Sequence, residues 1–460
     1  MTASDAIFDP AWLVRATGGR WLGGPTAPVK GICHDTRTLH AGDLYVAIRG
    51  ARIDGHTLIA EAFEKGAVAA LVDEVYAKQH PGTGDVPLLV VADVLPALGR
   101  LASMHRHRIG AWIMGITGSM GKTTVKEMTA ALLRQRGETV CTRGNWNNNI
   151  GLPLSMLAMR TDTQFGVFEI GMNHPGEIRP LSEILTPDWA VITAIGPVHL
   201  EFFDSVEDIA REKAELLRSL PASGTAFLYV GDPYYSILKS SAPCHVKTVG
   251  VGVDSAADMR VVADRGVLHI YEGAAAPVEM PLPAPGKHNL VNAGLAVLVG
   301  RTAGCDWEQI RKGFAAYQSP PMRWEVQSCG PYTVVNDAYN ANPVSMQSAL
   351  DTFRQMQSQG QKWLVLGDML ELGGFAREAH QVLGRQVAAG EWAGMAAVGL
   401  HAETVRDAAI DTGMRESSVA AFRTVHDVGE WLLPQLKHGD ALLLKGSRGV
   451  QLEHVLSYLK

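Results

Sequence analysis

The sequence predicts an α/β protein of three domains with mostly parallel sheets. At 460 residues, the chain is longer than one hydrophobic core usually serves. Short apolar segments typical of strands alternate with helical patterns along the chain, as they do in parallel α/β sheets. Hydrophobic residues make up 47% and charged residues 19%, a balance that indicates folded globular domains rather than a disordered or fibrous chain.

Charge and cysteine content narrow the class of function. The net charge of −6 gives no overall field that attracts nucleic acid or an anionic membrane, so an anionic ligand must be held in a local pocket. The five cysteines lack C-x-x-C spacing and suggest neither a disulfide framework nor a zinc site, which favours a cytoplasmic protein. We expect no export signal or membrane insertion, because the acidic N-terminus lacks a basic and apolar leader and no run of about 18 apolar residues occurs.

A β-α-β unit predicts the first domain, residues 1–108. Residues 42–48 have the pattern of a strand, 56–66 that of a helix that ends at a glycine, and 67–72 that of a second strand. A later helical stretch ends in the basic run HRHR, after which a new apolar segment begins. We therefore place a domain boundary near residue 108.

The central domain, residues 109–319, is predicted from apolar strands and two helices. The strands are expected at AWIMGIT, VFEIG and WAVITAIG, and the helices over 123–136 and 205–220. Lys213 falls in the middle of the apolar face of the second helix. The apolar residues of that face are Val206, Ile209, Ala210, Leu217 and Leu220.

The third domain, residues 320–460, follows the linker QSPPMRW, whose paired prolines cannot continue a helix. Apolar strands alternate with helices here, which predicts a doubly wound, Rossmann-like sheet. The strands are expected at YTVVN, KWLVLG, MAAVG and ALLLKG. After the last strand, KGSRG (445–449) is expected to open a helix, where it either binds a carboxylate through Lys445, Arg448 and free amides or serves only as a helix cap.

The segment GITGSMGKTT (115–124) indicates a phosphate-binding loop. It lies between a strand and a helix, where glycines let backbone amides approach phosphate oxygens. Lys122 would place a charge near the β- and γ-phosphates, and Thr123 would offer its hydroxyl to Mg²⁺. Because Ile116 stands where the standard motif has its first glycine, an ordinary glycine-rich turn is the alternative.

Two polar residues follow the next strands. Glu169 ends the apolar run of VFEIG, where a carboxylate can reach a phosphate-bound metal; a surface glutamate is the alternative. His199 in PVHLE fits either a metal ligand or an ordinary loop histidine.

In this order, the segments resemble the Mur ligase family, the ATP-dependent amide-forming enzymes of peptidoglycan precursor synthesis, over nearly the whole chain. TGSMGKT is similar to the family's shortened P-loop, which accounts for the unusual spacing, and Lys213 lies in its A-x-x-K-x-E helix. The resemblance implies that the central domain is an ATPase that uses ATP and Mg²⁺. The implied catalytic residues are Lys122, His199, Lys213 and Arg323, and the implied metal ligands are Thr123, Glu169, His199 and Lys213. The implied ATP-binding residues are Gly118, Ser119, Gly121, Lys122, Thr123, Thr124, Asn289, Asn292, Arg323 and Asp337.

Lys213 has two interpretations. A lysine among apolar neighbours loses solvation, which lowers its pKa, and only the neutral amine adds CO₂. In the Mur ligase family this lysine is carbamylated, so the resemblance implies a carbamate that is an oxygen ligand to a second Mg²⁺. Spacing alone also allows Lys213 to extend to the helix edge and keep its ammonium in water.

Further segments match the family's nucleotide contacts. GKHNLVNAGLA resembles the segment whose asparagines, here Asn289 and Asn292, meet adenine. MRWE resembles the arginine segment that opens the C-terminal domain, so Arg323 would reach the γ-phosphate when the domains close; the usual glycine before it is Met322 here. By the same resemblance, Asp337 would bind the ribose hydroxyls.

The branch of the family is indicated by other segments. HDTRTLHAGDLYVAIRGARIDGH resembles the N-terminal uridine-diphosphate-binding domain, with Thr36 and Arg37 at its matched positions. DAYNANP, LGDMLELG and GNWNNNIG resemble the branch that adds D-alanyl-D-alanine, whereas the DNPR motif of the diaminopimelate-adding branch is absent. The substrate-binding residues implied by the last segment are Asn145, Asn147 and Asn148.

The resemblance thus implies a monomer that joins D-alanyl-D-alanine to UDP-N-acetylmuramoyl-tripeptide through an acyl phosphate. Two alternatives remain at this stage. A ligase that adds lysine or diaminopimelate is the nearer one. A nucleotide switch or motor is the other, although the guanine-reading NKxD motif is absent and such a protein has no use for a uridine-diphosphate domain.

Overall fold

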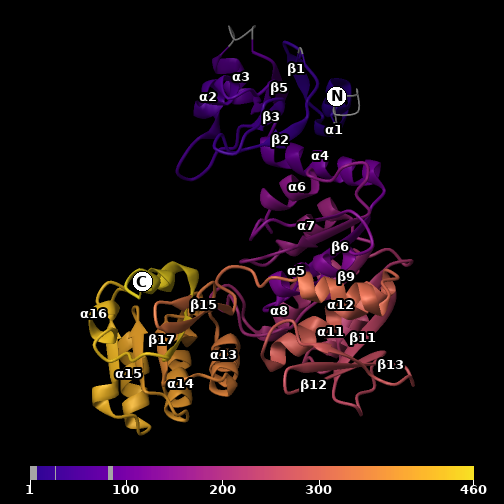
Figure 1. Ribbon diagram of the computed structural model, residues 1–460. Helices are drawn as coiled ribbons and strands as arrows, with labels where there is room; N and C mark the ends of the chain where they lie inside the picture. Colours follow the sequence, from indigo (N-terminus) through magenta and orange to yellow (C-terminus); the bar gives the residue numbers. More distant parts are fainter. Residues whose placement is uncertain (1–7, 26, 81–85, 460) are drawn as a thin grey trace.

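Three runs of strands and helices form three separate sheets, which confirms the three-domain α/β prediction (Figure 1). The computed structural model describes residues 8–25, 27–80 and 86–459. Residues 1–7, on which the expectation about an export signal partly rests, lie outside these ranges. Within them, no helix combines the length and apolar character needed to cross a bilayer. The boundaries near 108 and 319 stay predictions.

The N-terminal sheet has the order β1-β5-β4-β3-β2, parallel except for β1, which runs antiparallel to β5. The predicted β-α-β unit is confirmed as β3, η1 with α2, and β4. Its strands are β1 (Arg20–Leu22), β2 (Gly31–Cys33), β3 (Asp43–Val46), β4 (Ala69–Asp73) and β5 (Leu88–Val91). Its helices are α1 (Pro10–Thr17), η1 (Gly55–Leu58), α2 (Ile59–Glu64), α3 (Glu74–Gln79) and α4 (Val94–Ile109).

The central sheet has nine strands in the order β14-β13-β12-β11-β10-β9-β6-β8-β7. In this order, all strands from β12 to β7, including β6, are parallel to their neighbours. The strands β13 and β14 add an antiparallel edge that the sequence did not predict. The strands are β6 (Trp112–Thr117), β7 (Thr139–Cys141), β8 (Phe165–Glu169), β9 (Trp189–Ile192), β10 (Thr225–Tyr229), β11 (His245–Val251), β12 (Met259–Asp264), β13 (Val267–Glu272) and β14 (Val278–Pro281).

Helices cover both faces of the central sheet. One core layer contains α5 (Lys122–Leu133), α11 (Lys287–Thr302) and α12 (Trp307–Ala316). The opposite layer contains α6 (Gly151–Met156), α7 (Ile178–Leu185), α8 (Val206–Lys213), α9 (Glu215–Arg218) and α10 (Tyr235–Ser241). This second layer also packs against α4, so one apolar core continues from the N-terminal domain into the central domain.

The C-terminal sheet has the order β15-β16-β20-β17-β18-β19 and is parallel except for β15, which confirms the doubly wound prediction. In Figure 1 this domain, orange to yellow, lies beside the central domain. Its strands are β15 (Glu325–Cys329), β16 (Tyr332–Asn336), β17 (Lys362–Gly367), β18 (Gly394–Val398), β19 (Val419–Phe422) and β20 (Ala441–Lys445). Its helices are α13 (Pro343–Gln355), η2 (Gly373–Phe375), α14 (Ala376–Ala388), α15 (Ala402–Asp411), η3 (Glu416–Ser418) and α16 (Val428–Leu432).

Two helix predictions need correction. The helix expected over 205–220 is divided into α8 and α9 at Ala214, whose ψ of −14° is flatter than the value of about −42° in a regular helix. The helix expected after KGSRG consists of two short 3-10 turns, η4 (Arg448–Val450) and η5 (Leu452–Ser457). Gln451 separates them in a left-handed conformation, φ +59°, which an α-helix cannot contain.

Packing of α14 on α15 gives a test of the C-terminal core. Gly384 lies where a side-chain carbon would stand 2.4 Å from the backbone oxygen of Val405. We expect Gly384→Ala to lower the free energy of unfolding by about 1–3 kcal/mol despite alanine's better helix propensity, because the backbone cannot give way. Gly374→Ala, which meets nothing within 4 Å, is the control. Thermal unfolding followed by circular dichroism measures both, and equal stability of the two variants would contradict the close packing.

Candidate active site

The predicted phosphate loop lies at the carboxyl end of β6 and leads into α5, as a P-loop must. Gly118 and Gly121 have φ of +154° and +80°, and a side chain on Gly121 would stand 2.6 Å from Asn292. Both positions therefore require glycine. The Lys122 ammonium donates to the Gly118 carbonyl at 2.8 Å, and burial lowers the pKa of Lys122. Ser119 and Gly196 exchange two hydrogen bonds of 3.0 Å, which fix the loop to the end of β9, and Thr124 follows Thr123 in the first turn of α5.

The carboxylate of Glu169 is paired on both of its oxygens. It is 2% exposed and ends β8 beside the phosphate loop. Its two oxygens accept hydrogen bonds from the Thr123 hydroxyl and from the Asn147 side-chain amide, both at 2.8 Å. The surface-glutamate alternative is therefore wrong. Because the Thr123 hydroxyl lies next to the Glu169 carboxylate, two buried oxygen atoms could bind the same metal ion.

Lys213 lies at the end of α8, inside the protein. Its side chain is 1% exposed, so the alternative in which its ammonium extends into water is wrong. Burial lowers the pKa of Lys213 well below its ordinary value, and the nearby charge of Lys122 lowers it further, against the opposing effects of Glu212 and Glu169. No hydrogen bond or ion pair to its ammonium occurs among the residues that the structure describes. The neutral amine that carbamate formation requires is thus favoured.

His199 joins the central domain to the C-terminal domain. Its Nδ1 lies 2.5 Å from a carboxylate oxygen of Glu371, 172 residues away in the chain. This hydrogen bond is the main cause that lowers the pKa of Glu371. Both residues have left-handed backbones, with φ of +55° and +63°. The backbone of Glu201 also donates to the carbonyl of Glu371 at 3.4 Å, so two loops meet at this point.

Arg323 enters the site from the start of the C-terminal domain, where its guanidinium lies 4.1 Å from the ring centroid of Tyr339. Met322, which stands where the family has glycine, adopts a left-handed φ of +60°. Met322 thus adopts, without being glycine, a backbone conformation that glycine adopts most easily. Its backbone is held at both ends, because the Met322 amide donates to Glu325 at 2.9 Å and the Met322 carbonyl accepts from Tyr339 at 3.1 Å.

Asn289 and Asn292 lie in the first turns of α11, both almost fully buried, and hydrogen bond to each other at 2.9 Å. Contact of Asn292 with Gly121 brings this pair to the phosphate loop. Asp337 follows β16 and forms an ion pair of 2.8 Å with Lys445. Lys445 thus has a structural partner, and nothing among the described contacts leaves it free for a carboxylate.

A cavity of about 730 Å³ brings the central and C-terminal residues together. Its lining includes the predicted residues Lys122, Asn145, Asn147, Asn148, Glu169, His199 and Arg323, and also Arg448 of KGSRG, for which the sequence allows two interpretations. Tyr339, Asn340, Leu370 and Glu371 of the C-terminal domain also line it and were not predicted as site residues. Glu371 lies in LGDMLELG, the segment that indicated the branch of the family. The sequence therefore drew attention to this segment, but the contact between Glu371 and His199 could not be inferred from it.

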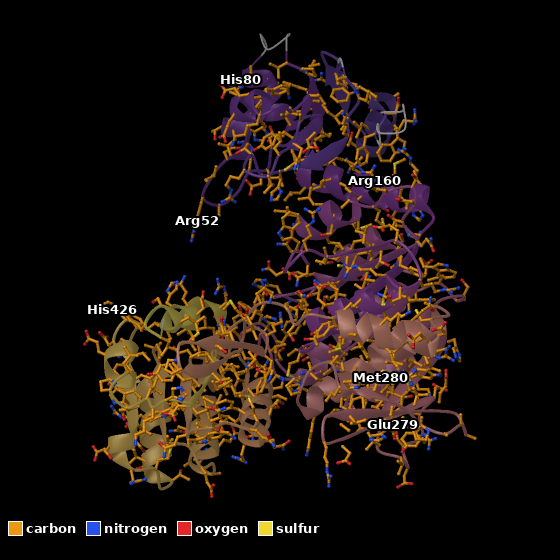
Figure 2. All side chains as sticks on the ribbon, in the orientation of Figure 1. Arg52, His80, Arg160, Glu279, Met280 and His426 are labelled. Carbon is orange, nitrogen blue, oxygen red and sulfur yellow. The ribbon has the colours of Figure 1, made fainter. Side chains whose placement is uncertain are left out.

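Thr36 and Arg37 lie apart from that cavity, in the N-terminal domain. Thr36 is buried, whereas Arg37 is exposed and paired with Asp35, and this hydrogen bond is the main cause that lowers the pKa of Asp35 to about 2. The nearest link is the ring contact of His34 with Trp146, 5.5 Å between centroids, in the segment that carries the three predicted asparagines. Arg52 is a further cation, and Figure 2 shows it pointing away from its domain on the side of the C-terminal domain.

The donor set fits Mg²⁺. Among the described residues, no three His, Cys, Asp or Glu side chains converge, so these residues offer no ready-made cage for zinc or calcium. The buried oxygens of Thr123 and Glu169 beside a phosphate loop suit an ion that binds through one or two protein oxygens, substrate phosphates and water.

Fold and site together define an α/β protein with a phosphate-loop geometry after β6 and a cavity between its central and C-terminal domains. Models of three domains match the chain: "Mur ligase family, catalytic domain" at residues 28–106, "Mur ligase middle domain" at 116–300 and "Mur ligase, glutamate ligase domain" at 322–448. The chain belongs to the Mur ligase family and is a ligase.

Individual relatives are similar over nearly their whole length. The UDP-N-acetylmuramoyl-tripeptide–D-alanyl-D-alanine ligase of Bacillus subtilis is 34% identical, with 94% of this chain and 93% of that protein covered. Among solved structures, MurF from Acinetobacter baumannii is 30% identical with a TM-score of 0.86 and 98% of both chains covered. MurF ligase from Thermotoga maritima in complex with ADP is 26% identical with a TM-score of 0.78, covering 94% of this chain and 97% of that chain.

The contact between His199 and Glu371 gives a test of the domain arrangement. We expect Glu371→Ala to loosen the two loops, because it removes the hydrogen bond that joins them. Hydrogen exchange of residues 199–202, measured by mass spectrometry, should become faster. Glu378→Ala, which changes an exposed glutamate of α14, should leave it unchanged. Equal exchange in both variants would mean that the loops are held by other contacts.

Proposed function

We propose that this protein joins D-alanyl-D-alanine to UDP-N-acetylmuramoyl-tripeptide, with conversion of ATP to ADP and phosphate. The product is the UDP-muramoyl-pentapeptide used in peptidoglycan synthesis. The observation that carries the proposal is the nearly end-to-end similarity to ligases of this name. The cavity between two domains, with a phosphate loop on one wall and an arginine on the other, supports it.

The reaction has two steps. The terminal carboxylate of the tripeptide attacks the γ-phosphorus of ATP, and the bond to the bridging oxygen breaks to release ADP. The amine of D-alanyl-D-alanine then attacks the acyl phosphate, loses a proton and displaces inorganic phosphate. Carboxylate and triphosphate repel each other, so the protein's task is to position them and to offset their charge.

The residues of this chain divide that task. Lys122 and the amides at the start of α5 would hold the phosphates, and Arg323 would approach the γ-phosphate from the other wall of the cavity. Thr123 and Glu169 would hold Mg²⁺, with His199 and a carbamate on Lys213 beside it. Bound there, Mg²⁺ neutralises phosphate charge and favours attack at phosphorus.

Substrate contacts follow the same division by domain. Asn289, Asn292 and Asp337 would contact the adenosine part of ATP, and Thr36 with Arg37 would contact the uridine diphosphate. The segment that carries Asn145, Asn147 and Asn148 lies between these two regions and would hold the peptide. We propose that the protein acts as a monomer in the cytoplasm.

Acceptor dependence tests the function. With ATP, Mg²⁺ and UDP-muramoyl-tripeptide present, we expect phosphate release only when D-alanyl-D-alanine is added, and the pentapeptide should be found by mass spectrometry. Free lysine or diaminopimelate serves as the control acceptor. Release with a free amino acid would identify the nearer alternative, and release without any acceptor would favour a nucleotide switch or motor.

Lys213 gives a second test, on the carbamate. We expect Lys213→Ala to abolish ligation while circular dichroism shows an unchanged fold, and added short carboxylic acids to restore part of the activity. Lys213→Met should also be inactive but at least as stable as the natural protein, because it replaces a buried amine that lacks a partner by an apolar side chain of similar length. Normal activity in either variant would exclude the carbamate.

A further inference from the structure

Lys126 is a fully buried lysine of α5, one turn beyond Lys122, and the proposed reaction gives it no role. Its side chain is 0% exposed. Its ammonium donates to the carbonyl of Thr142 at 2.7 Å, lies 3.5 Å from the carbonyl of Gly144, and forms an ion pair of 2.8 Å with Glu127. All three donors of the ammonium are thus used inside the protein.

The two carbonyls belong to an irregular segment, residues 142–149, which connects β7 with α6. Irregular backbone has no ladder of its own, so its buried carbonyls need partners from elsewhere. The Lys126 ammonium supplies one to the buried carbonyl of Thr142, at the start of the segment. Replacement of this cation by an apolar group would leave that carbonyl without its donor, whereas the carbonyl of the exposed Gly144 can turn to water. The defect would thus lie in this segment rather than in α5.

The same segment reaches the nucleotide site through Thr142 and Asn147. The Thr142 hydroxyl accepts the backbone N–H of Glu169 at 2.9 Å, and the Asn147 amide donates to the Glu169 carboxylate at 2.8 Å. The Asn147 carbonyl in turn accepts from the backbone of Gly171 at 2.9 Å. Position and orientation of Glu169 therefore depend on both ends of the segment.

Segment 142–149 also reaches the N-terminal domain. Trp146 contacts His34, one residue before Asp35 and two before Thr36. One short segment thus touches the residue proposed to hold Mg²⁺ and the loop proposed to bind the uridine diphosphate. The Lys126 ammonium contacts neither.

We propose that Lys126 is a positioning residue for the ligation reaction: it fixes segment 142–149, so that Glu169 and the His34 contact are held in register with each other. The proposal rests on the proposed function. Lys126 acts through this segment and not by contact with substrate. The binding of ATP and that of the UDP-linked peptide would both depend on where the segment is held.

The test uses Lys126→Met in the full-length protein. We expect hydrogen exchange of residues 142–149 to become about tenfold faster, while exchange in α11 and the C-terminal domain stays unchanged. We expect kcat/KM to fall about tenfold to a hundredfold for ATP and for UDP-muramoyl-tripeptide, because small displacements of positioned groups cost this much. The KM for D-alanyl-D-alanine should not change.

Lys247→Met is the matched control, because Lys247 donates at 3.0 Å to a side chain, that of Thr302, on the far part of the same domain. It should leave exchange and kinetics as they are. If Lys126→Met does not fold, Lys126→Gln replaces it, since an amide can still donate to one carbonyl; it should give intermediate exchange and intermediate kcat/KM.

Several outcomes would overturn the proposal. Unchanged exchange of 142–149, a uniform increase across the molecule, or an effect confined to the KM for D-alanyl-D-alanine would each do so. Failure of the proposed function can be distinguished from failure of this proposal. If the proposed function is wrong, the natural protein shows no phosphate release that depends on D-alanyl-D-alanine. The exchange measurement still decides whether Lys126 fixes the segment.

Discussion

The arrangement of the site depends on one constraint, that the buried carboxylate of Glu169 must be paired on both oxygens. A buried ionised group without partners costs several kcal/mol, so the fold has to bring donors to it. Those donors come from α5 through Thr123 and from segment 142–149 through Asn147, and the backbone of Glu169 itself is tied to Thr142. These hydrogen bonds hold β8, α5 and segment 142–149 together at the carboxyl ends of the strands, beside the phosphate loop.

Burial acts on two amines near this carboxylate. Lys122 and Lys213 both feel the charge of Glu169, and burial lowers the pKa of both lysines. For Lys213, burial and the nearby charge of Lys122 together shift the side chain toward the neutral amine, the form that can add CO₂. For Lys122, a bound triphosphate would favour the ammonium again, because an opposite charge stabilises the charged form. The apolar stripe of α8 thus gives a physical reason for a buried lysine at this position, where spacing alone gave two interpretations.

The sequence was informative where function is local in the chain. The phosphate loop, the strand end with Glu169 and the alternating strands could be predicted because glycines, apolar runs and helical spacing act over a few residues. Contacts between distant residues could not, as His199 and Glu371 show. The division of 205–220 at Ala214 could not be predicted either, since alanine is the best helix former and the local sequence gives no signal for a break there. The role proposed for Lys126 could not be predicted either, because in the sequence it is one of several lysines in helices.

The three domains are joined by different kinds of contact, and this decides which of them can move. A continuous apolar core passes from the N-terminal domain through α4 to α6 and α7, and separating the two would expose it. The C-terminal domain instead meets the central domain through the proline-rich linker, a short contact of α11 with α13, and the loops that carry His199 and Glu371. Interfaces of this kind exchange partners more easily than an apolar core does. We therefore expect the wall with Arg323, Tyr339 and Glu371 to move relative to the wall formed by Glu169 and the phosphate loop.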